Sequence, residues 1–396
     1  MWVPSLGSFS SKRSSSLLEL DTSLKTLQDR IMENVEVFGT KKNQMVLGGE
    51  MNEWHFHNSA PTTKIQTPTI LIHGYAASSM AFHRTFGSLS RDIRDLYAID
   101  LPGNGLSLPV PMPADTPKAR VTSFKVSKEK GSNTIKARVN KLVDRDREKE
   151  ILQLYEDYYL ERIDEWRQLN GIEKLNIVGH SFGGYISFKY AIKYPDRVKD
   201  LCLISPLGME RNIYSLNNTL EEGREYTLNE ENPTLTTYTR NFKIPEVLYN
   251  NQLNVLRWMG PVGGRLARRY IDFAYRRVPG TEYGDYLYRI FYESKTFPKV
   301  TISNFNNMFT RSLLAKDPIM DNLDKLRARK VMLMYGDHDW MDRYAGFLMN
   351  EELKHHYERY AGNGKVEYVE VPEAGHNLFL DNPDFFSSKI SAFLST

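Results

Sequence analysis

The chain contains very little cysteine and no long hydrophobic run. A single cysteine, Cys202, occurs among 396 residues, so no disulfide can form within the chain, which favours a reducing compartment. It lies in the apolar run 201–204 and is expected in a core strand. No apolar run reaches the roughly 18 residues that a membrane-spanning helix needs, so we expect no transmembrane segment. No internal repeat is visible.

The excess of positive charge is small. A formal net charge of +3 does not indicate a nucleic-acid partner, and we predict none. The charge is concentrated, however, because the stretch 118–141 holds eight Lys or Arg against the single Glu129. We interpret about 110–147 as a flexible basic insertion, either a solvated loop or a segment attracted to an anionic membrane surface.

The N-terminal segment 1–16 is serine-rich and carries Lys12 and Arg13. It is either a short mitochondrial presequence or a disordered tail, so the predicted location is intracellular, cytoplasmic or mitochondrial. Apolar residues then recur at three- and four-residue steps between positions 17 and 35, which predicts an amphipathic helix that packs on the core or contacts a membrane.

The most informative stretch is Gly179-His-Ser-Phe-Gly183. The apolar run 174–178 before it predicts a buried strand, and 184–194 after it predicts a helix that Pro195 ends. Strand, G-x-S-x-G and helix form a nucleophile elbow, in which a sharp turn exposes the serine hydroxyl. Gly179 and Gly183 are needed because a Cβ at either position would collide with the neighbouring backbone. Ser181 is therefore the predicted nucleophile.

A nucleophilic serine needs a general base, and His376 is our prediction. It follows the alternating run 366–371, so it lies just past an expected strand. The acid that orients this base is expected after the apolar run 331–335. We assign it to Asp339; Asp342 remains an alternative.

Asp337 is a further, less favoured candidate for the acid.

The oxyanion of an acyl-transfer intermediate needs two N–H donors. The apolar run 69–72 leads into His73-Gly74, and we predict that the backbone N–H groups of Tyr75 and Phe182 supply them. His73 itself is interpreted as a structural histidine.

These residues resemble the α/β-hydrolase superfamily from about residue 54 to residue 394. The longer stretches 71–82, 179–191 and 375–383 are similar to the branch that holds the lipid-droplet lipase coactivator, the N-acyl-phospholipid lipase and their fungal relatives, a cardiolipin-specific deacylase and a lysophosphatidic acid acyltransferase. The resemblance implies an α/β fold: a mostly parallel central sheet flanked by helices, with a helical cap insertion. The coactivator lacks the elbow serine, so Ser181 implies an active enzyme.

The resemblance also divides the chain. It implies a first part of the hydrolase core over 17–205, a cap over 206–318 and a second part of the core over 319–396. The predicted cap is rich in aromatics and in arginines, which can grip acyl chains and phosphate respectively. Seven arginines lie between residues 257 and 289 of this cap: Arg257, Arg265, Arg268, Arg269, Arg276, Arg277 and Arg289.

Two further patterns have competing interpretations. His376 and Asp381 form an H-x4-D pattern, read in this branch as an acyltransferase signature, but we favour Asp381 as a helix cap ahead of Pro383. His55 and His57 share one face of an expected strand, but no third ligand is evident in the sequence, so no metal site is predicted.

The leading hypothesis is a serine phospholipase that deacylates a membrane glycerophospholipid such as cardiolipin, without metal or organic cofactor. It would associate peripherally with anionic membranes and bind phospholipid or lysophospholipid. The same acyl-enzyme would serve a lysophosphatidic acid acyltransferase. A non-catalytic coactivator and a soluble small-ester hydrolase are the remaining alternatives. A serine at position 181, rather than an aspartate, argues against an epoxide hydrolase.

Overall fold

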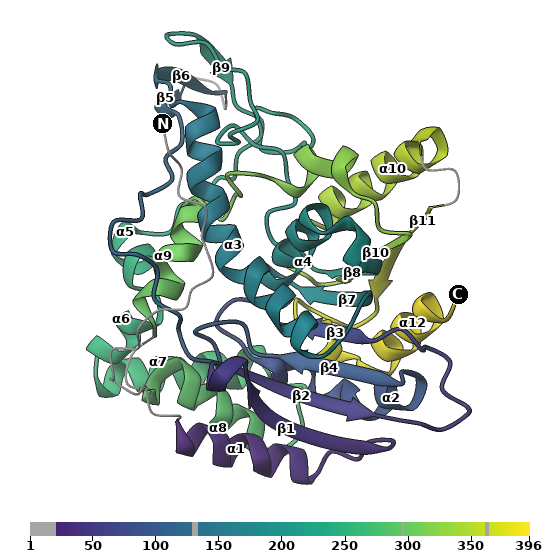
Figure 1. Ribbon diagram of the computed structural model, residues 1–396. Helices are drawn as coiled ribbons and strands as arrows, with labels where there is room; N and C mark the ends of the chain where they lie inside the picture. Colours follow the sequence, from purple (N-terminus) through teal and green to yellow (C-terminus); the bar gives the residue numbers. More distant parts are fainter. Residues whose placement is uncertain (1–20, 129–133, 295–296, 361–363) are drawn as a thin grey trace.

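The computed structural model describes residues 21–128, 134–294, 297–360 and 364–396. Eight strands form the central sheet in the order β1-β2-β4-β3-β7-β8-β10-β11 (Figure 1). Strand β2 pairs antiparallel with both of its neighbours, β1 and β4, and all the other neighbouring pairs are parallel. Their bounds are β1 Thr40–Val46, β2 Met51–His57, β3 Thr69–Ile72, β4 Asp95–Ile99, β7 Leu175–His180, β8 Val198–Ile204, β10 Lys330–Gly336 and β11 Lys365–Val371.

Helices cover both faces of this sheet (Figure 1). One face packs against α3 (Arg145–Leu169), α4 (Phe182–Lys193) and α10 (Arg343–Tyr360). The other packs against α2 (Phe86–Asp92), α11 (Leu378–Asp381) and α12 (Pro383–Ser395). Strand residues alternate between the two cores, as a period of two requires: Leu201 and Leu203 face the first, and Cys202 the second. The prediction of a mostly parallel α/β fold is confirmed.

A large helical segment separates β8 from β10. Among its described residues, none joins the central sheet. It carries α5 (Glu246–Asn251), α6 (Leu253–Trp258), α7 (Pro261–Ala274), α8 (Glu282–Tyr288), the π-helical turn η4 (Arg289–Glu293) and α9 (Lys299–Met308). Helix α1 (Thr22–Glu33) packs against α8 of this segment and buries Leu24, Ile31 and Met32. Leu17 and Leu20, the first residues of the predicted stripe, lie outside the described residues.

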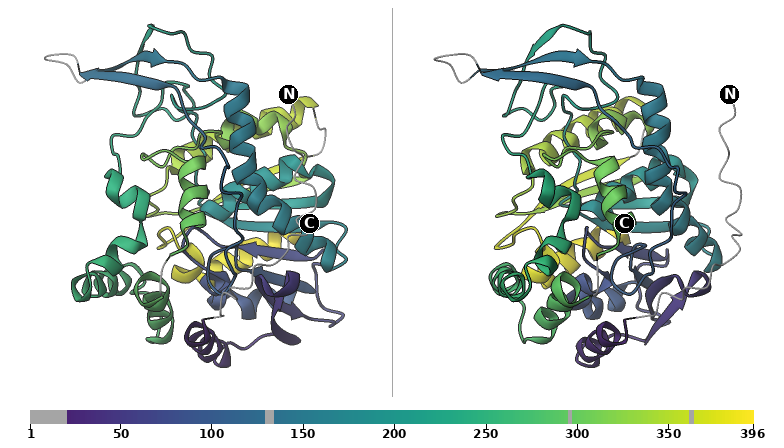
Figure 2. Two further views of the ribbon diagram at one scale, coloured as in Figure 1. Left: turned by 60° about the vertical axis from the view of Figure 1, so that its left-hand side comes forward. Right: turned by 90° about the vertical axis from the view of Figure 1, so that its left-hand side faces the viewer.

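The basic stretch that we expected to be a flexible insertion forms a β-hairpin instead. Strands β5 (Ser123–Lys128) and β6 (Ile135–Lys141) pair antiparallel, and β9 (Glu225–Thr227) extends them to a three-stranded sheet that projects from the body (Figure 2). Strands are found where we expected a loop because that interpretation counted charge and overlooked alternation: Ala137 and Val139 are buried on one face of β6. In the described part of the chain, no helix has the length and apolar character needed to cross a membrane.

Candidate active site

Ser181 occupies a sharp turn between β7 and α4. Its φ of 54° and ψ of −116° lie in a region that residues with a Cβ rarely adopt. The turn is held because the Ser181 N–H donates to the carbonyl of Ile204 at 2.9 Å. A Cβ on Gly183 would lie 2.4 Å from the carbonyl oxygen of His73, so only glycine lets the helix approach the strand this closely. The local structure is the strand–turn–helix that the sequence predicts.

His376 and Asp339 meet beside this turn. The Nδ1 atom of His376 lies 3.1 Å from Oδ1 of Asp339, whose side chain is fully buried. The ring of His376 also contacts those of His180 and Trp340, with centroids 4.6 and 4.9 Å away. With Nδ1 turned to the carboxylate, Nε2 is left as the atom that can take a proton.

The carboxylate of Asp339 is held as an anion. Burial acts to raise its pKa, but hydrogen bonds from His376, Ser205 and the N–H of Met341, together with the attraction of the imidazole, outweigh burial and lower the pKa. Ser205 directly follows β8, next to the elbow strand, and the sequence reasoning did not identify it. Its place after a buried strand of the same sheet was a signal that could have found it.

The other two aspartates of this loop have different contacts. Asp342 lies at the start of α10, where its Oδ1 accepts the N–H of Ala345 at 3.0 Å, as a helix cap does. Asp337 accepts the N–H groups of Glu373 and Ala374, each at 2.9 Å, and so braces the loop that leads to His376. Of the three predicted candidates, the structure brings Asp339 to the histidine.

The loop that holds Tyr75 lies against the serine. A Cβ on Gly74 would be 3.1 Å from the Ser181 Cβ, and the rings of Tyr75 and Phe182 meet edge to face at 5.8 Å. The side chain of Tyr75 is fixed by a hydrogen bond from its hydroxyl to Gln252, on the segment between β8 and β10. The two residues predicted to form the oxyanion hole therefore flank Ser181.

His73 is a structural residue, as predicted. Its Nδ1 bonds the carbonyl of Gly74 at 2.6 Å, and its Nε2 accepts the N–H of Leu101 at 2.9 Å. Burial lowers its pKa, more than the nearby Asp100 and the bond to Gly74 raise it. A neutral imidazole satisfied on both nitrogens ties β3 to the end of β4.

Ser181 and His376 open into one cavity of about 660 Å³. Its walls come from the core and from the segment between β8 and β10, including Leu248, Leu256 and Phe291. Among the described residues that line it, none is Lys, Arg, Asp or Glu. The arginines of this segment do not contribute to its lining, so the cavity suits an apolar chain rather than a phosphate.

The geometry agrees with comparisons to known proteins. A family model described as alpha/beta hydrolase fold matches residues 67–383. The chain belongs to the alpha/beta hydrolase fold family.

Three similar proteins are informative. A Saccharomyces cerevisiae protein named 1-acylglycerol-3-phosphate O-acyltransferase ICT1 is 48% identical, over 94% of this chain and 92% of its own. A human protein named (Lyso)-N-acylphosphatidylethanolamine lipase is 24% identical, over 84% of this chain and 80% of its own. A solved 2-hydroxy-6-oxo-6-phenylhexa-2,4-dienoate hydrolase from Rhodococcus sp. strain RHA1 has a TM-score of 0.54 at 16% identity, over 90% of this chain and 99% of that chain, and shows the shared fold. The resemblance to the branch of acyltransferases and lipases is confirmed.

In this alpha/beta hydrolase, Asp381 differs from its predicted role as a helix cap. Its Oδ2 accepts the N–H of Gly375 at 2.8 Å, while the neighbouring Asn382 caps α12 by accepting the N–H of Phe385. The prediction was one residue off because Asn and Asp are equally good caps, and spacing alone does not choose between them. Asp381 shapes the turn that presents His376.

Proposed function

We propose that this alpha/beta hydrolase transfers fatty acyl groups from membrane glycerophospholipids through an acyl-enzyme on Ser181. The observation that supports this most is the union of the strained serine, the histidine bonded to Asp339 and an apolar cavity free of Lys, Arg, Asp and Glu. Such a cavity binds an acyl chain by burial of apolar surface. The names of the relatives, an acyltransferase and a lipase, support the same lipid class.

In the first step His376 removes the Ser181 proton through Nε2, and the serine oxygen attacks the ester carbonyl. Asp339 keeps the Nδ1 proton in place and stabilises the imidazolium that forms. The oxyanion is held by the N–H groups of Tyr75 and Phe182. The bond to the glycerol oxygen then breaks, His376 returns the proton to that oxygen, and a lysophospholipid leaves.

In the second step a hydroxyl attacks the acyl-enzyme and gives its proton to His376. We propose lysophosphatidate as this acceptor, because the relative that is 48% identical is named 1-acylglycerol-3-phosphate O-acyltransferase. The bond between the acyl carbonyl and the Ser181 oxygen then breaks, phosphatidate leaves, and His376 returns the proton to Ser181. Hydrolysis, with water as the acceptor, is the second candidate and is supported by the relative named a lipase. The two activities share every step up to the acyl-enzyme. Cardiolipin is one donor to be tested among others.

A peripheral contact with the membrane would deliver such substrates, and α7 offers the surface for it. Val262, Leu266, Tyr270 and Phe273 form a stripe along this helix in which each residue is between 43 and 69% exposed. Leu266 and Tyr270 also line the catalytic cavity, so the stripe adjoins the cavity wall. Arginines alternate with it on the same helix, a pattern that favours anionic lipid surfaces.

The test uses purified full-length protein, its Ser181→Ala variant and a matched Ser388→Ala control, whose hydroxyl is on the exposed surface of α12. Each is incubated with vesicles of cardiolipin and other phospholipids, with and without lysophosphatidate, and the products are followed by lipid mass spectrometry. We expect the loss of Ser181 to reduce turnover about 10⁴-fold or more, and the control to match the wild type.

The products distinguish the candidates. Serine-dependent phosphatidate supports the transferase, and serine-dependent free fatty acid supports the lipase. Equal turnover by wild type and Ser181→Ala would contradict the proposed role of Ser181. No lipid change with either protein would also contradict the proposal and would favour a non-catalytic coactivator.

A further inference from the structure

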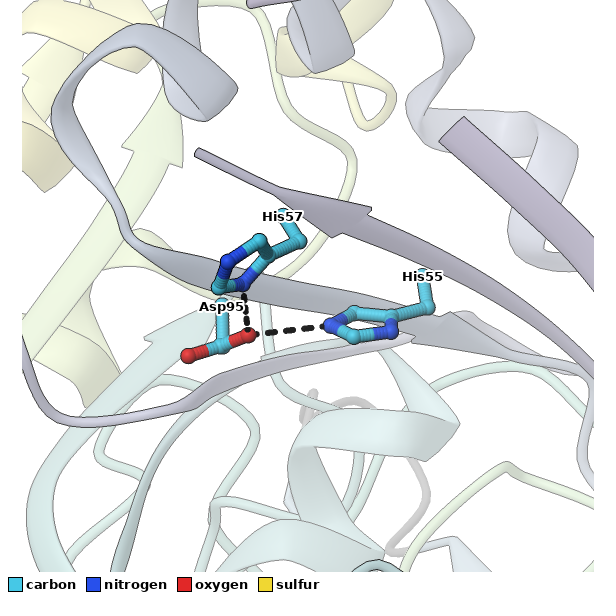
Figure 3. A group of neighbouring side chains, drawn as sticks. All are labelled: His55, His57 and Asp95. Atoms are coloured by element: carbon cyan, nitrogen blue, oxygen red, sulfur yellow. Dashed lines mark hydrogen bonds and ion pairs between the residues drawn. The ribbon is translucent and has the colours of Figure 1, made fainter. Parts of the chain in front are cut away.

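Two histidines and an aspartate far along the chain from the catalytic residues lie together on strands β2 and β4 (Figure 3). His55 and His57 point from the same face of β2, and Asp95, the first residue of β4, pairs with His57 across the antiparallel ladder. The sequence showed the two histidines without a third ligand; the sheet pairing supplies Asp95, 38 positions beyond His57.

The donor atoms converge on one point. Nε2 of His55 lies 3.0 Å and Nδ1 of His57 lies 2.7 Å from the same carboxylate oxygen, Oδ1 of Asp95. All three ligand atoms lie within 4.8 Å of one another. A tetrahedral zinc site has metal–ligand bonds of about 2.0–2.2 Å and hence ligands about 3.3 Å apart. Small outward shifts of the side chains would therefore admit a metal ion between them.

The ring of His55 is already oriented for this role. It stacks on Tyr97 of β4 with centroids 4.2 Å apart and planes only 6° from parallel. Tyr97 in turn meets Trp166 of α3 edge to face at 5.1 Å. Because the stack fixes the plane of the imidazole, Nε2 stays directed at Asp95. The outer partners of a metal-bound histidine orient its ring in a comparable way.

The surroundings leave room for further ligands. The side chains of His55, His57 and Asp95 are 25, 39 and 22% exposed, so water can reach the point between them. Arg94 lies 3.9 Å from the other oxygen of Asp95, Oδ2, which leaves Oδ1 for a single bond to a metal. The guanidinium charge also weakens cation binding, so we expect a site of modest affinity.

We propose that His55, His57 and Asp95 form a binding site for a divalent transition-metal ion of the zinc class. Two imidazoles and one carboxylate suit such ions and not Mg²⁺ or Ca²⁺, which prefer oxygen ligands throughout. Strands β4, β3 and β7 run parallel; Asp95 begins β4, whereas Ser181 follows the end of β7. The site therefore lies at the end of the strands opposite to the elbow. A bound ion would clamp β2 to β4 and stabilise the fold, and it takes no part in acyl transfer.

The test measures metal binding and thermal stability on tag-free, chelator-treated full-length protein. We expect about one Zn²⁺ per chain by calorimetry, a Co²⁺ spectrum typical of tetrahedral coordination, and a rise in Tm of about 3 °C or more at a hundredfold excess over Kd. The variants His57→Ala and Asp95→Asn should lose all three responses. The control His355→Ala, an exposed histidine on α10, should keep them, and Mg²⁺ should produce none.

Equal stoichiometry and equal Tm response in wild type and Asp95→Asn would overturn the proposal, because the metal would then bind without Asp95. No Zn²⁺ binding by the wild type would also overturn it and leave a hydrogen-bonded cluster only. Asp95→Asn preserves the shape of the side chain, and its fold is checked by circular dichroism without metal. If His57→Ala does not fold, Asp95→Asn decides alone. Because none of the three readouts involves a lipid, failure here is separable from failure of the proposed acyl transfer.

Discussion

At the scale of single residues, the loop after β10 shows how three similar side chains acquire different roles. Asp337, Asp339 and Asp342 lie within six positions of one another. Each finds a different set of donors: backbone N–H groups of the histidine loop, the imidazole itself, and the first turn of α10. A carboxylate acts on the base only if it can reach Nδ1, so position in the fold decides the role.

The first prediction compares two isosteric variants. Asp339→Asn should lower kcat for ester cleavage about 10⁴-fold, because an amide no longer holds the productive tautomer of His376. Asp342→Asn should keep activity near that of the wild type, because Asn caps a helix about as well as Asp. Steady-state kinetics on a soluble ester and on phospholipid vesicles measures both. A larger loss in Asp342→Asn than in Asp339→Asn would refute our assignment of the acid.

At the scale of elements, α7 is unusual because its larger apolar side chains lie on its exposed face. Its buried face, with Gly263, Ala267 and Ile271, is small, whereas its larger apolar residues face outwards. Arg268 is paired with Asp285 at 2.9 Å, and its guanidinium also covers the ring of Tyr288 at 4.4 Å. A soluble protein rarely leaves a stripe of this kind exposed unless the stripe meets another apolar phase.

The second prediction tests this face and the neighbouring end of α6 with a double variant, Trp258→Ser at the last residue of α6 and Phe273→Ser on α7. Both residues are more than 60% exposed, and neither lines the catalytic cavity. Binding to phosphatidylserine vesicles, measured by flotation, should fall at least about tenfold, because each lost ring removes roughly 1.5–3 kcal/mol of apolar transfer.

Turnover of a soluble ester should not change in this double variant. Leu169→Ser, at the 60% exposed end of α3, is the matched control and should bind vesicles as the wild type does. Undiminished vesicle binding by the double variant would show that the surface formed by α7 and the end of α6 is not the membrane contact.

At the scale of the whole molecule, a buried charge network joins helices α3 and α4 to the chain between α9 and β10. Lys189 of α4 contacts Asp317 and lies 3.3 Å from Glu156 of α3. Asn217 and Asn322 donate to the other oxygen of Asp317 at 2.7 and 2.8 Å. Although burial acts to raise the pKa of Asp317, Lys189 and these amides lower it to about 2.

The third prediction concerns acid stability. The pKa of Asp317 is lower in the folded chain than its ordinary value near 3.8, so its contribution is complete above that value and is lost as pH falls towards 2. The shift corresponds to about 2 kcal/mol. The free energy of unfolding of wild type should therefore fall more steeply below about pH 4 than that of Asp317→Asn, which is less stable at pH 7.

Urea unfolding at a series of pH values from 7 to 3 measures this difference. Asp196→Asn, an exposed carboxylate on the turn after α4, serves as the control and should parallel the wild type. Parallel curves for Asp317→Asn and wild type would mean that the network does not contribute to acid stability.

Much of this molecule was predictable because its signals are local. The elbow needs glycines at fixed offsets from a serine, and buried parallel strands are short apolar runs, so the order of strand, motif and helix can be read along the chain. The hairpin β5–β6 was missed because Ala137 and Val139 form a sparse alternation inside a basic stretch. The predicted cap of α12 was one residue away from the observed one because Asp381 and Asn382 are chemically equivalent candidates.

The sequence by itself determined the fold class, the place of Ser181 at an elbow and the candidate partners His376 and Asp339. Only the tertiary structure decided which aspartate bonds the histidine, that the arginines lie outside the cavity lining, and that Asp95 joins His55 and His57. The physical reason is the range of the interactions. Turns and strand periodicity act over a few residues, whereas a hydrogen bond or a metal site joins atoms whose separation along the chain carries no information about their separation in space.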